Sequence, residues 1–480
     1  MSVDLVIKNG RVVTHEREFH GGVAVDGGRI VAVGPDDSLP EGCEVVDAGG
    51  KVITPGAIDP HTHPGAYHPF GDDIQKQTRA AAAGGVTTML GIVKVTRMSR
   101  KYKEITEPGD VISYKEVFPE ARAMIEAGGH VDVGLTFAVQ SDQHAEEIPF
   151  YAEEYGVTSY KFYLGYKNPT PWTCRIGLPS RWDDGTLFAA MENIATIGGT
   201  AMFHAENHEV VRVLEARLKA HGKNDMAAWS ARSPGYLESY HVKTVGHFAE
   251  AVGTTIYAVH VNTADGIAEV INQRRRGIRI AAECTPQHLL LTTNDERTLG
   301  NALVLHPPIR NTSDQTALWK GVYENQVQVI GTDDVPGTRA ELGKPLGEHE
   351  CWKGKSGMVG VETVFPLMLS EGHHKRGIPL TRIVELCSYN AAKSFGLHPR
   401  KGTLQVGADA DINVVDLEKR VTITAERLHN YSDFTVFEGR EVRGWPVMTF
   451  LRGRLVAKDG EPVGGKQGRY LKRGPTIHVA

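Results

Sequence analysis

Residues 51–332 repeat one rhythm, in which a short apolar segment is followed by a loop and, in most repeats, by a helical pattern. Alternating strands and helices are typical of a parallel sheet whose faces are covered by the helices. Eight such units predict a closed (β/α)8 barrel of the α/β class. The predicted barrel strands are Lys51–Ile58, Thr87–Ile92, Val131–Val139, Thr158–Leu164, Thr200–His204, Thr255–Val261, Ile278–Glu283 and Val327–Thr332.

A doubly wound open sheet is the structural alternative to the barrel. That fold usually carries a glycine-rich phosphate loop after its first strand. Here the first predicted strand is followed by Pro60-His61-Thr62-His63, and no G-x-G-x-x-G occurs there. We therefore expect the barrel, in which catalytic residues lie at the C-terminal ends of the strands.

Both ends of the chain read as short β-strands separated by glycine turns, with Asn9-Gly10 and Asp26-Gly27-Gly28 as hairpin signals. Neither end is large enough to bury a core alone. We expect the two ends to meet in one small β-sandwich. The predicted domains are residues 1–54 and 401–480, which form the sandwich and a tail, and residues 55–400, which form the barrel.

Composition excludes several classes of function. The 480 residues carry a net charge of −5, which provides no basic field for nucleic acid. The five cysteines form no C-x-x-C pair, so neither a disulfide framework nor a zinc knot is indicated. The N-terminus lacks the features of a signal peptide, and no apolar run reaches membrane-spanning length. We expect a cytoplasmic protein without membrane or nucleic-acid partners.

Residues of metal-binding type lie in or just after five of the predicted strands. His61 and His63 are two positions apart, so both side chains of an extended segment point to one face. A lysine within an apolar strand, as at Lys161, is rarely buried without a partner or a function. Imidazole and carboxylate are ligands for zinc and similar metals. The candidate ligands are His61, His63, Lys161, His204, His260 and Asp333.

This order of ligands on a barrel with a sandwich from both chain ends resembles the amidohydrolase superfamily. Within it, the chain is most similar to the cyclic amidases, namely the hydantoinases and dihydropyrimidinases. The phrases that carry the resemblance span nearly the whole chain. They are Pro55–His63, Ala80–Thr88, Gly156–Lys161, His204–Asn207, Pro307–Arg310, Phe395–Leu397, Pro399–Thr403 and Gly407–Asp411.

The resemblance implies a centre of two divalent metal ions. His61, His63 and Asp333 would hold one ion, and His204 and His260 the other. Lys161 would bridge both after its amine reacts with carbon dioxide to form a carbamate, N6-carboxylysine. An ammonium group cannot bind a cation, whereas a carbamate offers two anionic oxygens. The ligand types suit zinc, with manganese, cobalt or iron left open.

The implied activity is hydrolysis of a cyclic amide, imide or ureide by a hydroxide that bridges the two metals. Asp333 would accept the proton of this hydroxide and pass it to the leaving nitrogen. Tyr166 would stabilise the oxyanion. Asn262, His306 and Ser356 would contact the substrate.

Three positions depart from the hydantoinase pattern. Asp334 replaces a histidine, and we expect it to bring negative charge beside the metals. His306 replaces a serine and Ser356 an asparagine, at positions where the family contacts substrate largely through backbone. Gly65 occupies the place where dihydroorotases carry a carboxylate-binding arginine, which argues against dihydroorotate as substrate.

Other interpretations stay open on the same scaffold, namely an allantoinase, a cyclic imidase or a lactonase. A non-catalytic protein is a further alternative, because some dihydropyrimidinase relatives have lost their ligands, but this chain keeps all six. A homodimer or homotetramer is expected by analogy. His68, Trp172 and His288 are interpreted as structural residues rather than as residues that line the pocket. The segment Lys94–Pro108 is either a lid or a solvated face.

Overall fold

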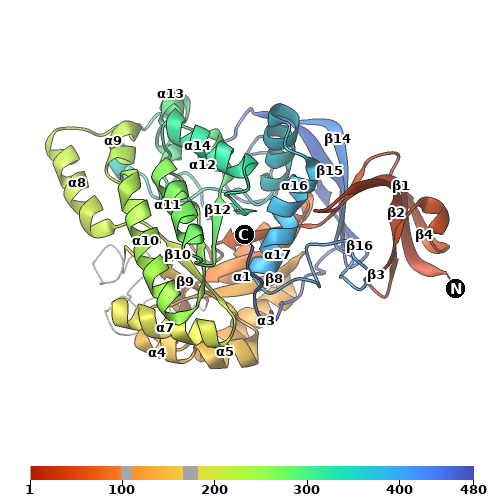
Figure 1. Ribbon diagram of the computed structural model, residues 1–480. Coiled ribbons are helices and arrows are strands. Elements are labelled where there is room, and N and C mark those ends of the chain that lie inside the picture. Colours follow the sequence, from red (N-terminus) through yellow and green to blue (C-terminus); the bar gives the residue numbers. More distant parts are fainter. Residues whose placement is uncertain (1, 99–110, 166–181, 480) are drawn as a thin grey trace.

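The computed structural model describes residues 2–98, 111–165 and 182–479. It consists of a barrel and of a sheet that is built from both ends of the chain (Figure 1). The barrel has eight parallel strands, each hydrogen-bonded to the next in chain order. They are β6 (Ala57–Thr62), β7 (Val86–Val93), β8 (Asp132–Ala138), β9 (Ser159–Tyr163), β10 (Thr200–His204), β11 (Thr255–Ala258), β12 (Ile280–Cys284) and β13 (Val329–Ile330).

The seam between the first and the last barrel strand is closed by backbone contacts just after β13. Asp334 pairs with Thr62 of β6 in a parallel bridge. The amide of His63 donates to the carbonyl of Asp334 at 2.8 Å. These contacts confirm the expected barrel. Every residue of β7 is buried, as expected for a parallel strand that is covered on both faces.

Helices surround the barrel on its outer side (Figure 1). The longest, α10, has an N-terminal proline and ends at Gly253, which adopts the left-handed conformation that glycine favours. The described α-helices are α1 (Phe70–Ala83), α2 (Val95–Met98), α3 (Phe118–Gly128), α4 (Asp142–Glu146), α5 (Ile148–Tyr155), α7 (Asp184–Thr196), α8 (His208–Ala220), α9 (Met226–Ala231), α10 (Gly235–Val252), α11 (Ala264–Arg275), α12 (Pro286–Leu290), α13 (Glu296–Leu299), α14 (Thr312–Tyr323), α15 (Val364–Leu367), α16 (Leu380–Val384) and α17 (Asn390–Ser394).

The prediction that Lys51–Ile58 forms a single barrel strand is wrong. Residues 52–55 form β5, which pairs with the chain ends, and the barrel begins only with β6 at Ala57. The chain passes between the two sheets at Gly56, where a Cβ atom would lie 2.2 Å from the hydroxyl of Thr87. Residues 52–62 are all buried, so an apolar pattern alone does not show where the chain changes sheets.

The sheet at the chain ends has nine strands, and β5 joins its two halves by pairing with β1 on one side and β14 on the other. Residues of both halves, such as Leu5 and Phe450, share one hydrophobic core. This arrangement confirms the composite domain. Its strands are β1 (Val3–Val13), β2 (Glu18–Asp26), β3 (Arg29–Gly34), β4 (Gly42–Asp47), β5 (Val52–Pro55), β14 (Ile412–Thr422), β15 (Glu441–Leu451), β16 (Arg454–Lys458) and β17 (Glu461–Pro462).

One of the two expected hairpin turns is a bulge. Asn9, with a φ angle of +57°, interrupts the register within the continuous strand β1 rather than ending it. The other expected turn is confirmed, because Asp26 pairs with Arg29 across Gly27-Gly28. A signal such as Asn-Gly is therefore satisfied by either structure, since both need at least one residue in the left-handed region.

A buried charge network joins the barrel to the terminal sheet. Lys401 is 1% exposed, and its Nζ lies 2.6 Å from Asp132, 2.7 Å from Asp411 and 3.0 Å from Asp409. Arg452 also pairs with Asp132, the first residue of β8. Such a network is stable only while every charge keeps its partner.

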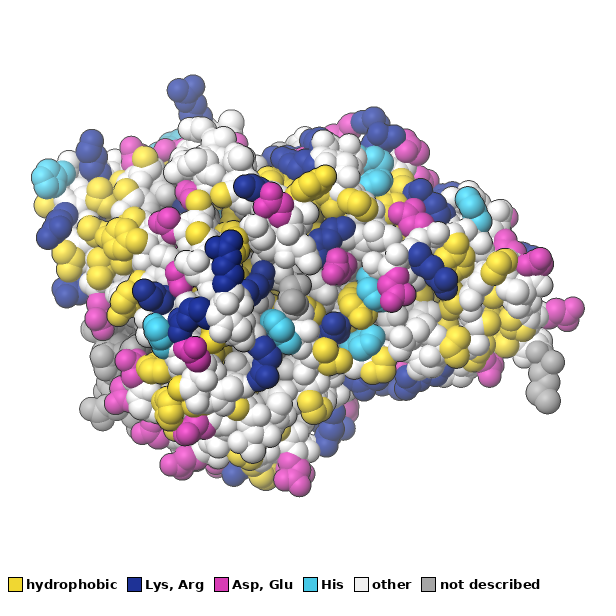
Figure 2. All heavy atoms as spheres, in the orientation of Figure 1, with side chains coloured by type: hydrophobic (Ala, Val, Ile, Leu, Met, Phe, Trp, Pro, Cys, Tyr) yellow, Lys and Arg dark blue, Asp and Glu magenta, His cyan; other side chains and the backbone are white. Residues whose placement is uncertain are grey.

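The surface shows mixed charges rather than a field of one sign. On the face in Figure 2, basic and acidic side chains alternate. Among the described helices, none has the length and apolar character that crossing a bilayer would require.

Candidate metal centre

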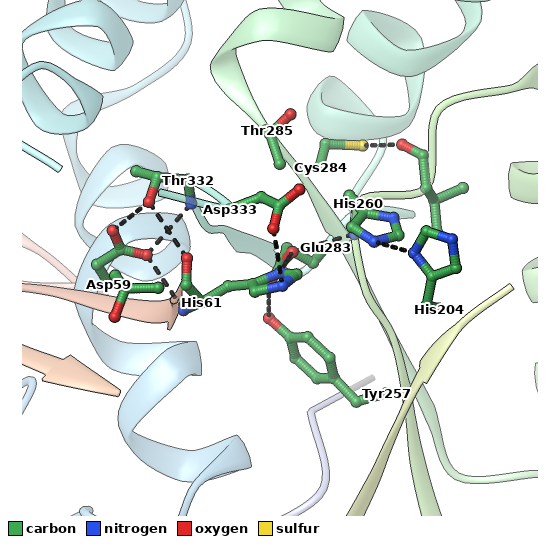
Figure 3. A network of polar contacts seen from close by, with 12 residues as sticks. Asp59, His61, His204, Tyr257, His260, Glu283, Cys284, Thr285, Thr332 and Asp333 are labelled. Atoms are coloured by element: carbon green, nitrogen blue, oxygen red, sulfur yellow. Dashed lines mark hydrogen bonds and ion pairs between the residues drawn. The ribbon is translucent and has the colours of Figure 1, made fainter. Parts of the chain in front are cut away.

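The two histidines of the H-x-H motif meet Asp333 at the C-terminal mouth of the barrel. Figure 3 shows His61 beside Asp333. The Nε2 atoms of His61 and His63 lie 3.2 Å apart. Oδ1 of Asp333 lies 3.3 Å from the first and 2.9 Å from the second. Ligand atoms about 2.0–2.2 Å from one zinc ion at tetrahedral or square angles lie roughly 3–3.5 Å from each other. The three side chains therefore fit one shared cation.

The electrostatics of these three residues favour a bound cation. Burial lowers the pKa of both His61 and His63, so their rings are neutral and keep a lone pair. Burial alone would raise the pKa of Asp333, but His61 and His63 hold it well below its usual range. The site thus presents two neutral imidazoles and one carboxylate, which is a donor set typical of zinc.

Lys161 points from the middle of β9 towards the same place. Its side chain is 1% exposed, and Nζ lies 3.4 Å from Nε2 of His61. Burial lowers the pKa of Lys161 to about 8, against the opposing effect of Asp333 and Glu283. A lower pKa increases the fraction of neutral amine, which is the form that can react with carbon dioxide. The structure therefore supports the chemistry that a carbamate at this position requires.

The remaining pair of predicted ligands lies on the neighbouring strands. His204 ends β10 and His260 follows β11, and Nδ1 of His204 lies 2.9 Å from Nε2 of His260. Burial lowers the pKa of His260 well below its usual value. Two ring nitrogens at this distance fit either a hydrogen bond or a shared ion.

Two of the predicted ligands adopt a backbone conformation that side chains rarely take. The φ angle is +38° at His260 and +55° at Asp333. Non-glycine residues in this region are held there by their surroundings and cluster at functional sites. Both residues follow the ends of their strands, and this backbone conformation directs their side chains to the barrel mouth.

Glu283 is a site residue that the sequence analysis missed. From the end of β12, its Oε1 lies 2.7 Å from Nδ1 of His61 and accepts the backbone amide of His260 at 3.0 Å. Tyr257 donates its hydroxyl to Oε2 at 2.9 Å (Figure 3). A carboxyl group that accepts from Nδ1 leaves the lone pair of Nε2 of His61 available to a metal ion. The missed signal was a charged residue in an apolar strand, the same signal that identified Lys161.

Replacing Glu283 by glutamine is expected to weaken metal binding by about 10–100-fold, because His61 loses the carboxyl group that holds its ring at Nδ1. The measurement is a competition between the protein and a fluorescent chelator. Glu362→Gln is the matched control, because Glu362 is also buried and its Oε1 lies 2.9 Å from Nδ1 of a histidine, His429. His429 is not one of the candidate ligands. Equal affinities for the two variants would show that Glu283 does not tune the metal centre.

Asp334 does not bring charge into the pocket as the sequence analysis expected. Its carboxylate turns away and accepts the backbone amides of Gly360 and Val361 at 2.7 and 3.2 Å. Its other oxygen is buried without a hydrogen-bond partner among the described residues. Burial raises the pKa of Asp334 to about 7, and the charge of Asp333 adds to that shift.

The candidate substrate contacts are mostly engaged with other groups. The amide nitrogen of Asn262 donates to the carbonyl of Pro308 at 3.2 Å. The hydroxyl of Ser356 accepts the backbone amide of His306 at 3.1 Å. His288 contacts Thr285 at 2.7 Å, which agrees with its structural interpretation. Direct contacts from these side chains would therefore require rearrangement, whereas their backbone positions are fixed.

Several residues that the sequence singles out lie outside the candidate metal centre or outside the described residues. Tyr166 and Trp172 fall outside the described residues, as does most of Lys94–Pro108. His68 lies after β6, where it pairs with Glu341 at 3.2 Å. Neither the oxyanion role nor the lid is therefore tested by the described part of the chain.

A second histidine–carboxylate group lies beside His204. Glu206, His208 and His306 place one potential ligand atom each within 4.8 Å of one another. Arg232 lies 3.1 Å from Nδ1 of His306 and 3.9 Å from Glu206. Because a guanidinium group only donates, it occupies the lone pair of that nitrogen and opposes a metal ion there. Glu206 instead supports the centre through Nε2 of His204, at 3.4 Å.

Comparisons with known proteins identify the family of the chain. The family model described as "Amidohydrolase family" matches residues 52–456. The chain is 32% identical to D-hydantoinase of Geobacillus stearothermophilus, with 98% of this chain and 96% of the relative covered. It is 31% identical to allantoinase of Rubrobacter xylanophilus, with 98% and 97% covered.

Solved structures of similar proteins share the whole fold. A dihydropyrimidinase from Brevibacillus agri superposes with a TM-score of 0.86 at 29% identity, over 99% of both chains. An L-hydantoinase from Arthrobacter aurescens superposes with a TM-score of 0.87 at 28% identity, over 98% of this chain and 100% of that chain. By the extent of the family match, and by relatives that align over nearly its full length, this chain belongs to the amidohydrolase family.

Proposed function

We propose that this protein is a metal-dependent hydrolase that opens the ring of a cyclic amide, imide or ureide. The observation that carries the proposal is the convergence of His61, His63 and Asp333 on one point beside the amine of Lys161. The similarity to hydantoinases, dihydropyrimidinases and an allantoinase supports cyclic C–N bonds as the target. All six predicted ligands are present, which argues against the non-catalytic alternative.

The metal centre is proposed to hold two divalent ions, with zinc favoured by the donor set of histidine and carboxylate. His61, His63 and Asp333 would hold one ion, His204 and His260 the other, and a carbamate on Lys161 would contact both. When bound, such ions lower the pKa of water and polarise the substrate carbonyl.

Asp333 is the residue proposed to move the proton. Its Oδ1 lies at the centre of the site, and its low pKa keeps it ionised and able to accept. Because the leaving nitrogen must take up a proton as its bond to the carbonyl carbon breaks, the accepted proton would be returned to that nitrogen. Tyr166 would donate its hydroxyl to the oxyanion that forms at the carbonyl.

The test is a substrate panel of hydantoin, dihydrouracil, allantoin, succinimide and a lactone, assayed before and after chelation. We expect ring opening of at least one cyclic amide, loss of activity on chelation and recovery with zinc. Activity on the lactone alone would contradict the proposal. A near-zero metal content after supplementation would favour the non-catalytic scaffold.

The assembly is proposed to be a homodimer or homotetramer by analogy with the family. Size-exclusion chromatography with light scattering on the full chain measures its mass directly. A monomer at micromolar concentration would contradict this proposal.

A further inference from the structure

Asp334 follows Asp333 directly and is joined by backbone hydrogen bonds to the segment that carries His61 and His63. Its carbonyl accepts the amide of His63 at 2.8 Å, and its own amide donates to the carbonyl of His61 at 3.3 Å. The preceding residue is Asp333. The position of the Asp334 side chain is therefore fixed relative to three of the predicted metal ligands.

The side chain of Asp334 holds a loop, residues 356–361, that borders the site. Its Oδ1 accepts two consecutive backbone amides, from Gly360 and Val361. A further backbone bond joins Val335 to the carbonyl of Met358 at 2.8 Å. The side chain of Asp334 is 1% exposed, so water does not compete for these bonds.

The other end of this loop meets two more loops at the mouth of the barrel. Tyr67, which follows β6, donates its hydroxyl to the backbone carbonyl of Ser356 at 3.1 Å. The hydroxyl of Ser356 accepts the backbone amide of His306, in the connection that follows β12. Loops at this end of a barrel form the substrate pocket. We therefore expect the loop to form part of the pocket wall. Asp334 holds the loop through the amides of Gly360 and Val361.

We propose that Asp334 is a positioning residue, which holds the 356–361 loop, and the substrate ring that contacts it, at a fixed place relative to Asp333. This inference rests on the proposed function for its effect on substrate. It explains why a carboxylate beside the metal centre is tolerated, because that carboxylate serves two backbone donors. Without an acceptor, those two buried amides would be left unsatisfied and the loop would shift.

The test compares Asp334→Ala with Asp334→Asn in the zinc-loaded full-length protein. Alanine removes the acceptor, and KM is expected to rise about 10–100-fold, the range expected for leaving buried amide donors unsatisfied. We expect a smaller change in kcat and an unchanged metal content. Asparagine keeps Oδ1 and changes only the oxygen that has no partner, so it is expected to recover most of the loss.

Asp416→Ala is the matched control. Oδ1 of Asp416 also accepts two backbone amides, from Glu418 and Lys419 at 2.9 and 3.1 Å, but in the terminal sheet. This variant is expected to leave KM at its wild-type value.

Hydrogen exchange of the loop provides a measurement that needs no substrate. The amides of Gly360 and Val361 are expected to exchange faster in Asp334→Ala than in Asp334→Asn or the wild type. Unchanged exchange, or an unchanged KM in the folded alanine variant, would overturn the proposal. If the wild type opened no cyclic amide, the proposed function would fail while exchange still tested the loop. Should alanine prevent folding, Asp334→Ser is measured in its place, with the same expected directions.

Discussion

Replacing Lys161 by arginine is expected to lower kcat/KM for ring opening by about 1,000-fold or more, which corresponds to about 4 kcal/mol of transition-state stabilisation. Arginine keeps a cation in the buried position but cannot form a carbamate, and a permanent positive charge there repels metal ions. The expected metal content therefore falls below that of the wild type. The measurements are steady-state kinetics on the best substrate of the panel and atomic emission on the same sample.

Dependence on carbon dioxide is the control for this prediction. Wild-type protein that has been stripped of metal is expected to regain full activity with zinc only when bicarbonate is present. The arginine variant is expected to show no response to bicarbonate. An arginine variant with wild-type kcat/KM and the same metal content would show that Lys161 is not a ligand.

The second large effect is on stability. Lys401→Met is expected to destabilise the protein by about 3–5 kcal/mol, because the buried carboxylates of Asp132 and Asp411 lose their shared cation. The methionine side chain fills a similar volume, so the loss reports on charge rather than on a cavity. Urea denaturation followed by circular dichroism measures the change.

Lys419→Met is the matched control for that variant. Lys419 faces Asp459 at 3.7 Å on the surface, where the carboxylate is 67% exposed. The expected change is at most about 1 kcal/mol, because solvent screens such a pair. Equal midpoints for the two methionine variants would show that the buried network does not hold the barrel to the terminal sheet.

The sequence was sufficient to predict the barrel and the place where several candidate ligands meet, because both depend on local signals. Each candidate ligand lies within an apolar strand, as Lys161 does, ends one, as His204 does, or follows one closely. In a parallel barrel the ends of all strands meet at one mouth, so fold and local pattern together place the residues. His61, His63 and Asp333 meet there as expected.

Contacts between distant segments were not predictable in the same way. The apolar run around Gly56 continues through both sheets, so burial conceals the boundary. The direction of the Asp334 carboxylate depends on amides 26 and 27 residues away. A carboxylate beside a candidate metal ligand therefore looks like a pocket feature in the sequence, although it accepts the backbone amides of a distant loop.

The pairing of β5 with both ends of the chain also has a consequence for biosynthesis. Pro55 finds its partner Ile412 only after roughly 350 further residues have been added, which takes about 20–70 s at usual translation rates. During that interval one edge of β5 has backbone groups without their final partners. An open strand edge is a template for association with other chains. Newly made chains are therefore expected to depend on chaperones until β14 has left the ribosome.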